Sequence, residues 1–560
     1  MRTLNRIILQ FALLFAAGGS LFAQGYKIEV TIKGNENGTA ILGHYFNTNM
    51  YPDDTIKLDS KGYGVFKKPT AMPDGMYIIF MPPGKVFEFM LSSAGQTFAL
   101  KTDTADLAGK LEFTGSEENT IFSGFQKFRI NKGEEINSLK DQLGKATSDA
   151  EKTTLTNRIN KLSEEINTES VRIINTYSNL FFGKFLKATR EIDVPDSPKD
   201  EAGKEIDPNF KYNYYRAHYF DNFDVGNAGL LRTPIYENKI NTYITKLVPQ
   251  VPDSLIKAAD WLIAKTVHNE ELFRYMLASL YNRYNTSNIM GMDAVLVFLI
   301  EKYYLSGKAT WLTEKSKKEM EELVLLKKPN LIGKVIRDFT FQRVDDDAFV
   351  NSISHPEIIA TTFGKDFKLN QIKSKYTLLI FWEADCSHCK VALPDLGSRY
   401  ARMKSKGCEV MAIHMLSGDP GRQKWFEFIN KNQLLGWINV WSPYSADYKV
   451  IYDIKSSPVV YLLDEKKAIL AKRIGVDQAE GLLYEREFRD LIQGKTEVSQ
   501  EELLVIAKKY VDAITEMPAM ELVQEFLLNY FDATNKPELE RYIKAIITKN
   551  KWEPSKKETH

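Results

Sequence analysis

The sequence predicts a multidomain protein in which an antiparallel β domain is followed by an α-helical middle domain, an α/β domain and a short helical C-terminal extension. Its 560 residues exceed what one hydrophobic core usually holds, since single domains have about 100 to 200 residues. Apolar and polar residues alternate up to about residue 113, then apolar residues recur at helical spacing, and strand and helix patterns alternate from about residue 333. The expected segments are a signal peptide at 1–23, the β domain at 24–118, the helical domain at 119–330, the α/β domain at 331–495 and the extension at 496–560.

The charge balance argues against a nucleic-acid partner. Lysine and arginine total 74 and aspartate and glutamate total 73, so the formal net charge is +1 and nothing in these totals favours a polyanion. Apolar residues make up 44% of the chain and aromatic residues 12%, which is enough to build packed cores. We therefore expect globular domains that recognise their partners at particular sites.

The first residues predict an export signal. A basic start, MRTLNR, precedes an apolar stretch that ends in Phe22, and the small residue Ala23 precedes the polar Gln24. The stretch is short and is broken by Gly18 and Gly19, which argues against a membrane anchor. We expect cleavage after Ala23, no integral membrane segment in the mature protein, and a periplasmic location within the cell envelope.

The β domain shows no catalytic constellation. Its strands alternate with turn residues such as Gly38, Asp53 and Gly62, as an antiparallel sheet requires. His44 is the isolated histidine of this region, and such a residue is more typical of packing or of the surface than of a ligand set. This pattern indicates a binding or spacer module.

Residues 119–330 predict helices. Apolar residues recur three and four positions apart, as in Phe122, Phe125 and Phe128, which is the spacing of one helix face. The highly charged stretch at 134–165 is typical of a solvated helical hairpin, with a partner-binding coiled coil as the alternative. Helical patterns return after residue 496 and predict the C-terminal extension.

The chain has only three cysteines, Cys386, Cys389 and Cys408. An exported protein that relied on structural disulfides would carry more of them. A structural zinc site needs four ligands, and the sequence offers neither a second CxxC nor paired histidines, so we expect no metal and no cofactor. Cys408 and His414 lie on one predicted strand and fit packing roles.

Around the first two cysteines, strand and helix patterns follow a recognisable order. The apolar run KYTLLIFW precedes Cys386, a helix containing Pro394 follows it, and Pro458 precedes the strand VVYLLDE. The order β, CxxC helix, β, α, β, α, Pro, β, β, α is that of a thioredoxin-like sheet. With the opening GKVIRDFTF and with Phe381 and Trp382 before the CxxC, residues 333–495 resemble the TlpA/ResA-like branch of the thioredoxin family, the exported thiol-disulfide oxidoreductases. The upstream β and helical regions look like uncharacterised domains that precede such thioredoxins.

The CxxC spacing assigns roles to the residues around it. Cys386 at a helix start meets free N–H groups and the helix dipole, which favour the thiolate, so it is the expected nucleophile. Cys389 lies one turn later and is the expected resolving thiol, which forms the disulfide with Cys386 on oxidation. An imidazole at His388 would lower the pKa of the thiolate further. The resemblance implies substrate contacts at Trp382, Ser457 and Pro458, with Pro458 in the cis form presenting the backbone of Ser457.

Three positions depart from the family pattern. Asp385 stands where the family often has tryptophan, and a carboxylate there raises the pKa of a neighbouring thiolate. Ile380 replaces the buried acid that assists the resolving thiol, and Ala392 replaces the branch's alternative glutamate. Glu383 is the nearest remaining carboxylate and could act as the base, with a surface-loop role as the alternative.

These observations predict a periplasmic thiol-disulfide oxidoreductase that acts on protein disulfides through the Cys386–Cys389 pair, as a reductase. The expected partners are protein thiols and disulfides, and a membrane-bound electron donor is compatible with this function. No nucleic-acid partner is expected. The alternative is a cell-envelope binding or scaffold protein that uses the thioredoxin fold as an interaction module, since most of the chain lies outside the redox domain.

Overall fold

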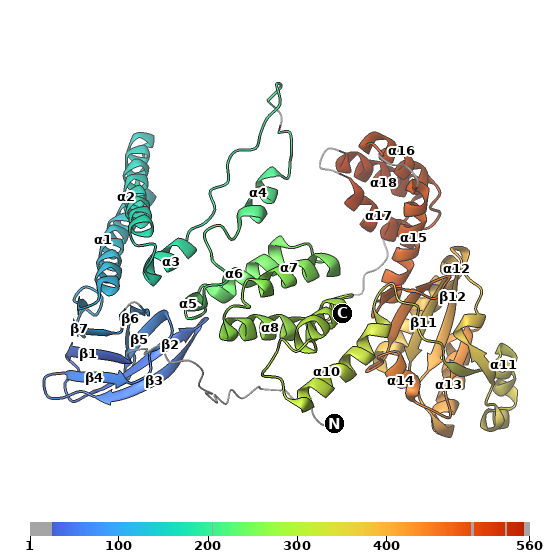
Figure 1. Ribbon diagram of the computed structural model, residues 1–560. Coiled ribbons are helices and arrows are strands. Elements are labelled where there is room, and N and C mark those ends of the chain that lie inside the picture. The colour runs from blue at the N-terminus through green and yellow to red at the C-terminus, as the bar shows by residue number, and fades with distance from the viewer. Residues whose placement is uncertain (1–24, 94, 204, 494–497, 532–534, 554–560) are drawn as a thin grey trace. The chain divides into compact units, whose positions relative to one another are not determined.

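The computed structural model describes residues 25–93, 95–203, 205–493, 498–531 and 535–553 (Figure 1). The predicted signal peptide lies outside these residues. The chain forms two compact units, one reaching residue 250 and including 254–278, the other comprising 251–253 and the chain from 279 onward. Among the described residues, no helix combines the length and the apolar character needed to cross a bilayer.

The first unit opens with two four-stranded sheets that pack through their buried faces. One has the order β4-β1-β7-β8 and the other β3-β2-β5-β6. Alternate residues of β1, namely Ile28, Val30 and Ile32, are fully buried, which is the period-two pattern of the sequence. The strands are β1 (Tyr26–Lys33), β2 (Thr39–Phe46), β3 (Asn49–Lys57), β4 (Tyr63–Lys68), β5 (Gly75–Met81), β6 (Lys85–Leu91), β7 (Thr97–Asp103) and β8 (Glu112–Thr114).

Their pairing is antiparallel, as predicted, with one exception. Strands β1 and β7 run parallel, with Ile28 opposite Phe98. Between them the chain builds the other sheet and β4, and it returns beside β1 in the same direction. A pairing between strands so far apart along the chain leaves no trace in the alternation of apolar residues.

Helices α1 and α2 form the predicted hairpin. Ser116 caps α1 and Ser148 caps α2, each followed by acidic residues that suit a helix N-terminus. The ion pair between Lys132 of α1 and Glu165 of α2 (2.5 Å) links the two helices. The helices up to residue 285 are α1 (Glu117–Lys145), α2 (Asp149–Thr176), α3 (Phe181–Ala188), α4 (Phe210–His218), α5 (Ala228–Leu231), α6 (Tyr236–Thr242), α7 (Pro252–Ala264) and α8 (Glu270–Asn285). The division into units falls within α7 and α8.

The second unit contains a seven-stranded mixed sheet of order β10-β9-β13-β12-β11-β14-β15. Strand β11 lies inside it, parallel to β12 and antiparallel to β14. The strands are β9 (Thr340–Arg343), β10 (Lys365–Lys368), β11 (Tyr376–Trp382), β12 (Cys408–His414), β13 (Ile438–Trp441), β14 (Val459–Asp464) and β15 (Ile469–Lys472). The helices are α9 (Asp293–Leu299), α10 (Glu314–Lys327), α11 (Asp346–Ser354), α12 (Ser387–Ser405), α13 (Gly418–Asn432), α14 (Asp447–Ile451) and α15 (Val476–Ile492).

Both faces of this sheet are covered, which explains why β11 is apolar throughout. All seven of its residues are buried. Leu378 and Ile380 join a core with α12, α13 and α15 on one face, whereas Leu379 and Phe381 join a core with α14 on the other. A strand buried on both faces is expected to show a continuous apolar run rather than alternation.

The division into units cuts through the segment predicted as one helical domain, 119–330. Helices α9 and α10 belong with the seven-stranded sheet because buried ion pairs hold them there. The Lys472 ammonium donates to Asp293 and to the backbone carbonyl of Asn330, and Lys327 pairs with Asp453 at 2.6 Å. Helical periodicity in the sequence gives no information on such tertiary ion pairs, so it predicted one continuous helical domain.

The C-terminal extension is helical, as predicted, and shares α15 with the sheet. Ala479 and Leu483 on α15 face the sheet core, while Tyr484 and Phe488 face the core of the extension. The remaining helices are α16 (Gln500–Asp512), α17 (Met517–Leu527) and α18 (Lys536–Asn550).

Candidate active site

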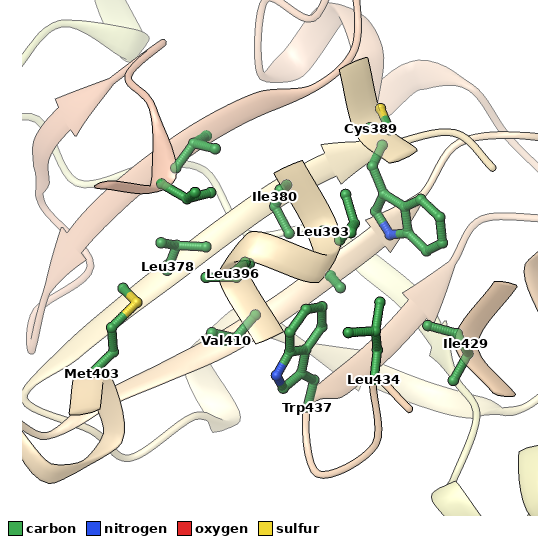
Figure 2. Close-up of a cluster of buried hydrophobic side chains, with 14 of the residues drawn as sticks. Leu378, Ile380, Cys389, Leu393, Leu396, Met403, Val410, Ile429, Leu434 and Trp437 are labelled. Carbon is green, nitrogen blue, oxygen red and sulfur yellow. The ribbon is translucent and has the colours of Figure 1, made fainter. Parts of the chain in front are cut away.

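The two close cysteines lie where β11 ends and α12 begins. Cys386 is the N-cap of α12, and its Sγ accepts a hydrogen bond from the backbone N–H of Cys389 at 3.4 Å. Cys386 is partly exposed, whereas Cys389 is completely buried. Figure 2 shows Cys389 at one end of the apolar cluster that contains Ile380 and Leu393. All three cysteines are free thiols here, so the pair is in the reduced form of the predicted redox couple.

The surroundings of Cys386 favour its thiolate. Burial raises its pKa, but hydrogen bonds with the Ser457 side chain and the Cys389 thiol lower it. The backbone N–H groups of Cys389 and His388 lower it further, so the pKa of Cys386 lies below its ordinary value of 9.0. Residue 388 thus contributes through its peptide N–H, and the predicted effect of the exposed His388 imidazole stays a prediction.

The other two cysteines remain protonated. Burial raises the pKa of Cys389 to about 12 and that of Cys408 to about 12. Cys408 starts β12 with 1% exposure, in agreement with the packing role expected from the sequence. Cys386 therefore stays the expected attacking thiol, and Cys389 the expected resolving thiol once its proton is removed.

The Ser457–Pro458 peptide bond is cis, as the sequence predicted, and it lies beside the cysteines. The Cys386 thiol donates to the backbone carbonyl of Ser457 at 3.3 Å. Pro458 immediately precedes β14, which pairs with β11. These positions suit the predicted contacts of Ser457 and Pro458 with an extended substrate.

Trp382 occupies a different place from the predicted one. Its indole is fully buried beneath the site and packs on His414 and Phe428. The prediction that Trp382 contacts substrate is therefore wrong. Its side chain points to the same face of the sheet as Leu378 and Ile380 because residues two apart on a strand share a face.

Glu383 lies next to the site and can reach it through Ser457. Its side chain accepts a hydrogen bond from the Ser457 hydroxyl at 3.5 Å, and its backbone carbonyl accepts one from the N–H of Cys386 at 3.2 Å. Ile380 is buried and apolar, so the position of the family's buried acid offers no proton acceptor. Glu383 stays the predicted base for the resolving thiol.

The sequence does not predict one ion pair next to the cysteines. The Asp385 carboxylate accepts a hydrogen bond from the Lys424 ammonium of α13 at 2.7 Å. The two residues lie 39 positions apart, and no motif connects them. No group of three or more potential metal ligands (His, Cys, Asp or Glu) was found within the described part of the chain.

Comparison with known proteins agrees with this geometry. Residues 332–506 match the AhpC/TSA family, residues 153–328 match a domain of unknown function (DUF5106), and residues 26–122 match another (DUF4369). The thiol-disulfide oxidoreductase ResA of Bacillus subtilis is 33% identical over 58 residues, which cover 10% of this chain and 32% of that protein. The ResA of Bacillus cereus is 28% identical over 134 residues, covering 23% of this chain and 73% of that protein.

Among solved structures, a domain of a possible thiol-disulfide isomerase from Cytophaga hutchinsonii is 29% identical and has a TM-score of 0.24, covering 29% of this chain and 97% of that one. The matches to the AhpC/TSA family and to the ResA proteins confirm the predicted resemblance of the C-terminal region to the ResA-like thioredoxins. The matches to DUF5106 and DUF4369 confirm that uncharacterised domains precede this region.

Proposed function

Since residues 332–506 form an AhpC/TSA thioredoxin-like domain related to the ResA oxidoreductases, we propose that this protein exchanges thiols and disulfides with protein substrates. One observation carries the proposal. Cys386 is partly exposed with a lowered pKa, while Cys389, three residues later, is buried with a pKa of about 12. An accessible thiolate paired with a protonated reserve thiol is the arrangement that dithiol exchange requires.

The reaction has two balanced steps. The Cys386 thiolate attacks one sulfur of the substrate disulfide, forms a mixed disulfide, and displaces the other substrate sulfur as a thiolate, which takes up a proton. Cys389 then loses its proton, with Glu383 as the proposed acceptor through Ser457, and attacks Sγ of Cys386. The second substrate thiol leaves, the substrate gains two electrons and two protons, and Cys386 and Cys389 become a disulfide.

We propose that the protein works as a reductase. A strongly oxidising pair needs a thiolate whose stabilisation far exceeds every opposing effect. Here burial, the largest influence on Cys386, raises its pKa and offsets part of the stabilisation that the hydrogen bonds give its thiolate. Continued turnover then needs an electron donor that reduces the Cys386–Cys389 disulfide again, and a membrane-bound donor fits the export signal predicted at 1–23.

The proposed location is the periplasm. Its support is the predicted signal sequence together with the shortage of structural cysteines, because an exported enzyme of this class keeps its thiols for exchange. Proteins that fold in this compartment form disulfides, and a dithiol reductase there has a supply of substrates.

The test compares the reduced parent protein with its Cys386→Ser variant on a model protein disulfide. The parent should reduce it, and the variant should lose all but background activity because the attacking sulfur is gone. The equilibrium potential of the Cys386–Cys389 couple decides the direction. A value near about −270 mV supports a reductase, and one near about −120 mV makes the protein an oxidant.

A second candidate function rests on the two upstream matches to uncharacterised domains, which cover residues 26–122 and 153–328. In that alternative the protein is an envelope binding or scaffold protein, and the thioredoxin fold serves as an interaction module. A Cys386→Ser variant that reduced the model disulfide as fast as the parent would favour this alternative.

A further inference from the structure

The residue that precedes the nucleophile takes part in an ion pair. Asp385 precedes Cys386, and its Oδ2 accepts a hydrogen bond from Nζ of Lys424 at 2.7 Å. Both side chains are about half exposed, so the pair lies at the surface rather than in the core. Lys424 belongs to α13, whereas Asp385 belongs to the short loop between β11 and α12.

Buried aromatic rings fix both ends of this pair. Trp425, next to Lys424, stacks on His414 with ring centroids 5.3 Å apart and planes 4° from parallel. His414 also contacts Trp382, edge-on, with ring centroids 5.0 Å apart. Trp382 is the last residue of β11 and carries the chain into the loop of Asp385. A packed column of three fully buried rings therefore sets the distance between α13 and this loop.

The charged groups near Cys386 indicate a role for the Asp385–Lys424 pair. Glu383 and Asp385 place two carboxylates within three residues of Cys386, and carboxylates disfavour a neighbouring thiolate. His414 interacts with Asp385 from the core but carries no charge, because burial lowers its pKa to about 3. His388 lies on the solvent side, and Lys424 is the cation that touches the Asp385 carboxylate.

We infer that Lys424 is a positioning residue for the exchange reaction, which compensates the Asp385 carboxylate and thereby limits the repulsion between that carboxylate and the Cys386 thiolate. This inference rests on the proposed function for its biological meaning. It also explains how the chain accommodates aspartate at a position where a carboxylate would otherwise oppose the nucleophile.

The test measures the reactivity of Cys386 itself. Reduced protein is treated with iodoacetamide between pH 5 and 10, and mass spectrometry follows the peptide that contains Cys386. The parent is compared with Lys424→Met, Lys424→Arg, Asp385→Asn and the double variant Asp385→Asn/Lys424→Met. Lys431→Met is the matched control, because it removes the same charge from an exposed position two turns further along α13.

Loss of compensation should slow the reaction. A unit charge near a partly exposed thiol changes its pKa by roughly half a unit, so Lys424→Met should lower the thiolate fraction of Cys386 at pH 7 about threefold and shift the profile to higher pH. A thiolate of higher pKa is more nucleophilic, so the alkylation rate should fall about twofold. Lys424→Arg and Lys431→Met should match the parent. Asp385→Asn should react faster than the parent, and the double variant should return to the parental rate because both charges are gone.

Two results would overturn the inference. One is a Lys424→Met profile that coincides with the parent's. The other is a double variant as slow as Lys424→Met, which would mean that lysine acts through folding of the loop rather than through charge. Alkylation does not require exchange, so an altered Lys424→Met profile in a protein that reduces no disulfide would support the inference while rejecting the proposed function.

Discussion

Selective alkylation of Cys386 is the most direct prediction of the active-site geometry. When the reduced protein meets a limiting amount of iodoacetamide at pH 7, the label should appear on Cys386 and hardly at all on Cys389 or Cys408. The physical reason is that only the thiolate reacts, and only Cys386 lies in surroundings that stabilise it.

The size of the preference follows from the pKa values. Cys386 lies below 9.0 and Cys389 near 12, a gap of more than about three units, so their thiolate fractions at pH 7 differ by more than about 1,000-fold. A thiolate of higher pKa is intrinsically more nucleophilic, which returns a factor of about 15 to 30. Cys386 should therefore react at least about 30 times faster than Cys389, before the complete burial of Cys389 is counted.

The assay is digestion and mass spectrometry after short labelling times. Cys386→Ser should remove the fast phase, and labelling in concentrated guanidinium chloride should bring all three thiols to similar rates, because unfolding abolishes their different surroundings. If Cys389 or Cys408 in the folded parent were labelled within about threefold of the rate of Cys386, the assignment of nucleophile and reserve thiol would be refuted.

Two further predictions concern the stability of the second unit. Within the described residues, Asp293→Ala leaves the buried Lys472 ammonium with the Asn330 carbonyl as its hydrogen-bond partner. Urea unfolding followed by tryptophan fluorescence should show a loss of about 3 kcal/mol in the free energy of unfolding, largely recovered in Asp293→Ala/Lys472→Met. A loss below about 1 kcal/mol would contradict this. Burial lowers the pKa of His414 from 6.5 to about 3, so between these pH values the unfolded chain binds a proton that the folded chain does not bind. His414 should therefore lower the free energy of unfolding by about 1.4 kcal/mol for each pH unit between about 6.5 and 3. His414→Phe keeps a ring against Trp425 and should lack this part of the pH dependence, and equal slopes for both proteins between pH 7 and 4 would argue against it.

The sequence was most informative where local chemistry determines the structure. A CxxC after a continuous apolar strand placed Cys386 at the N-cap of α12. The resemblance to the thioredoxin family placed the cis Pro458, which precedes β14, beside the cysteines. The first prediction depends on residues within one strand or one turn of the cysteines, whereas the second depends on the resemblance, because Pro458 lies 69 positions beyond Cys389. The predicted substrate contact at Trp382 failed because a strand buried on both faces has no alternation that tells which way a tryptophan points.

Long-range contacts set the limit of such predictions. The parallel pairing of β1 with β7 and the attachment of Asp293 to Lys472 join residues about 70 or more positions apart. Helical periodicity could show that α9 is a helix, but only the ion pair with Lys472 shows which core it belongs to. Periodicity reports which face of an element is apolar and carries no information on the partner that covers it.

Asp385 shows how this limit affects functional reasoning. From the sequence, a carboxylate next to the nucleophile opposes thiolate formation, and the sum of its effect and that of the neighbouring groups could not be worked out. The structure supplies Lys424 from α13, and the column of Trp425, His414 and Trp382 explains why this lysine arrives at the right place. The tuning of Cys386 therefore depends on the packing of α13 against β12, so a core substitution such as His414→Ala should also shift the alkylation profile of Cys386 by loosening the Lys424–Asp385 pair.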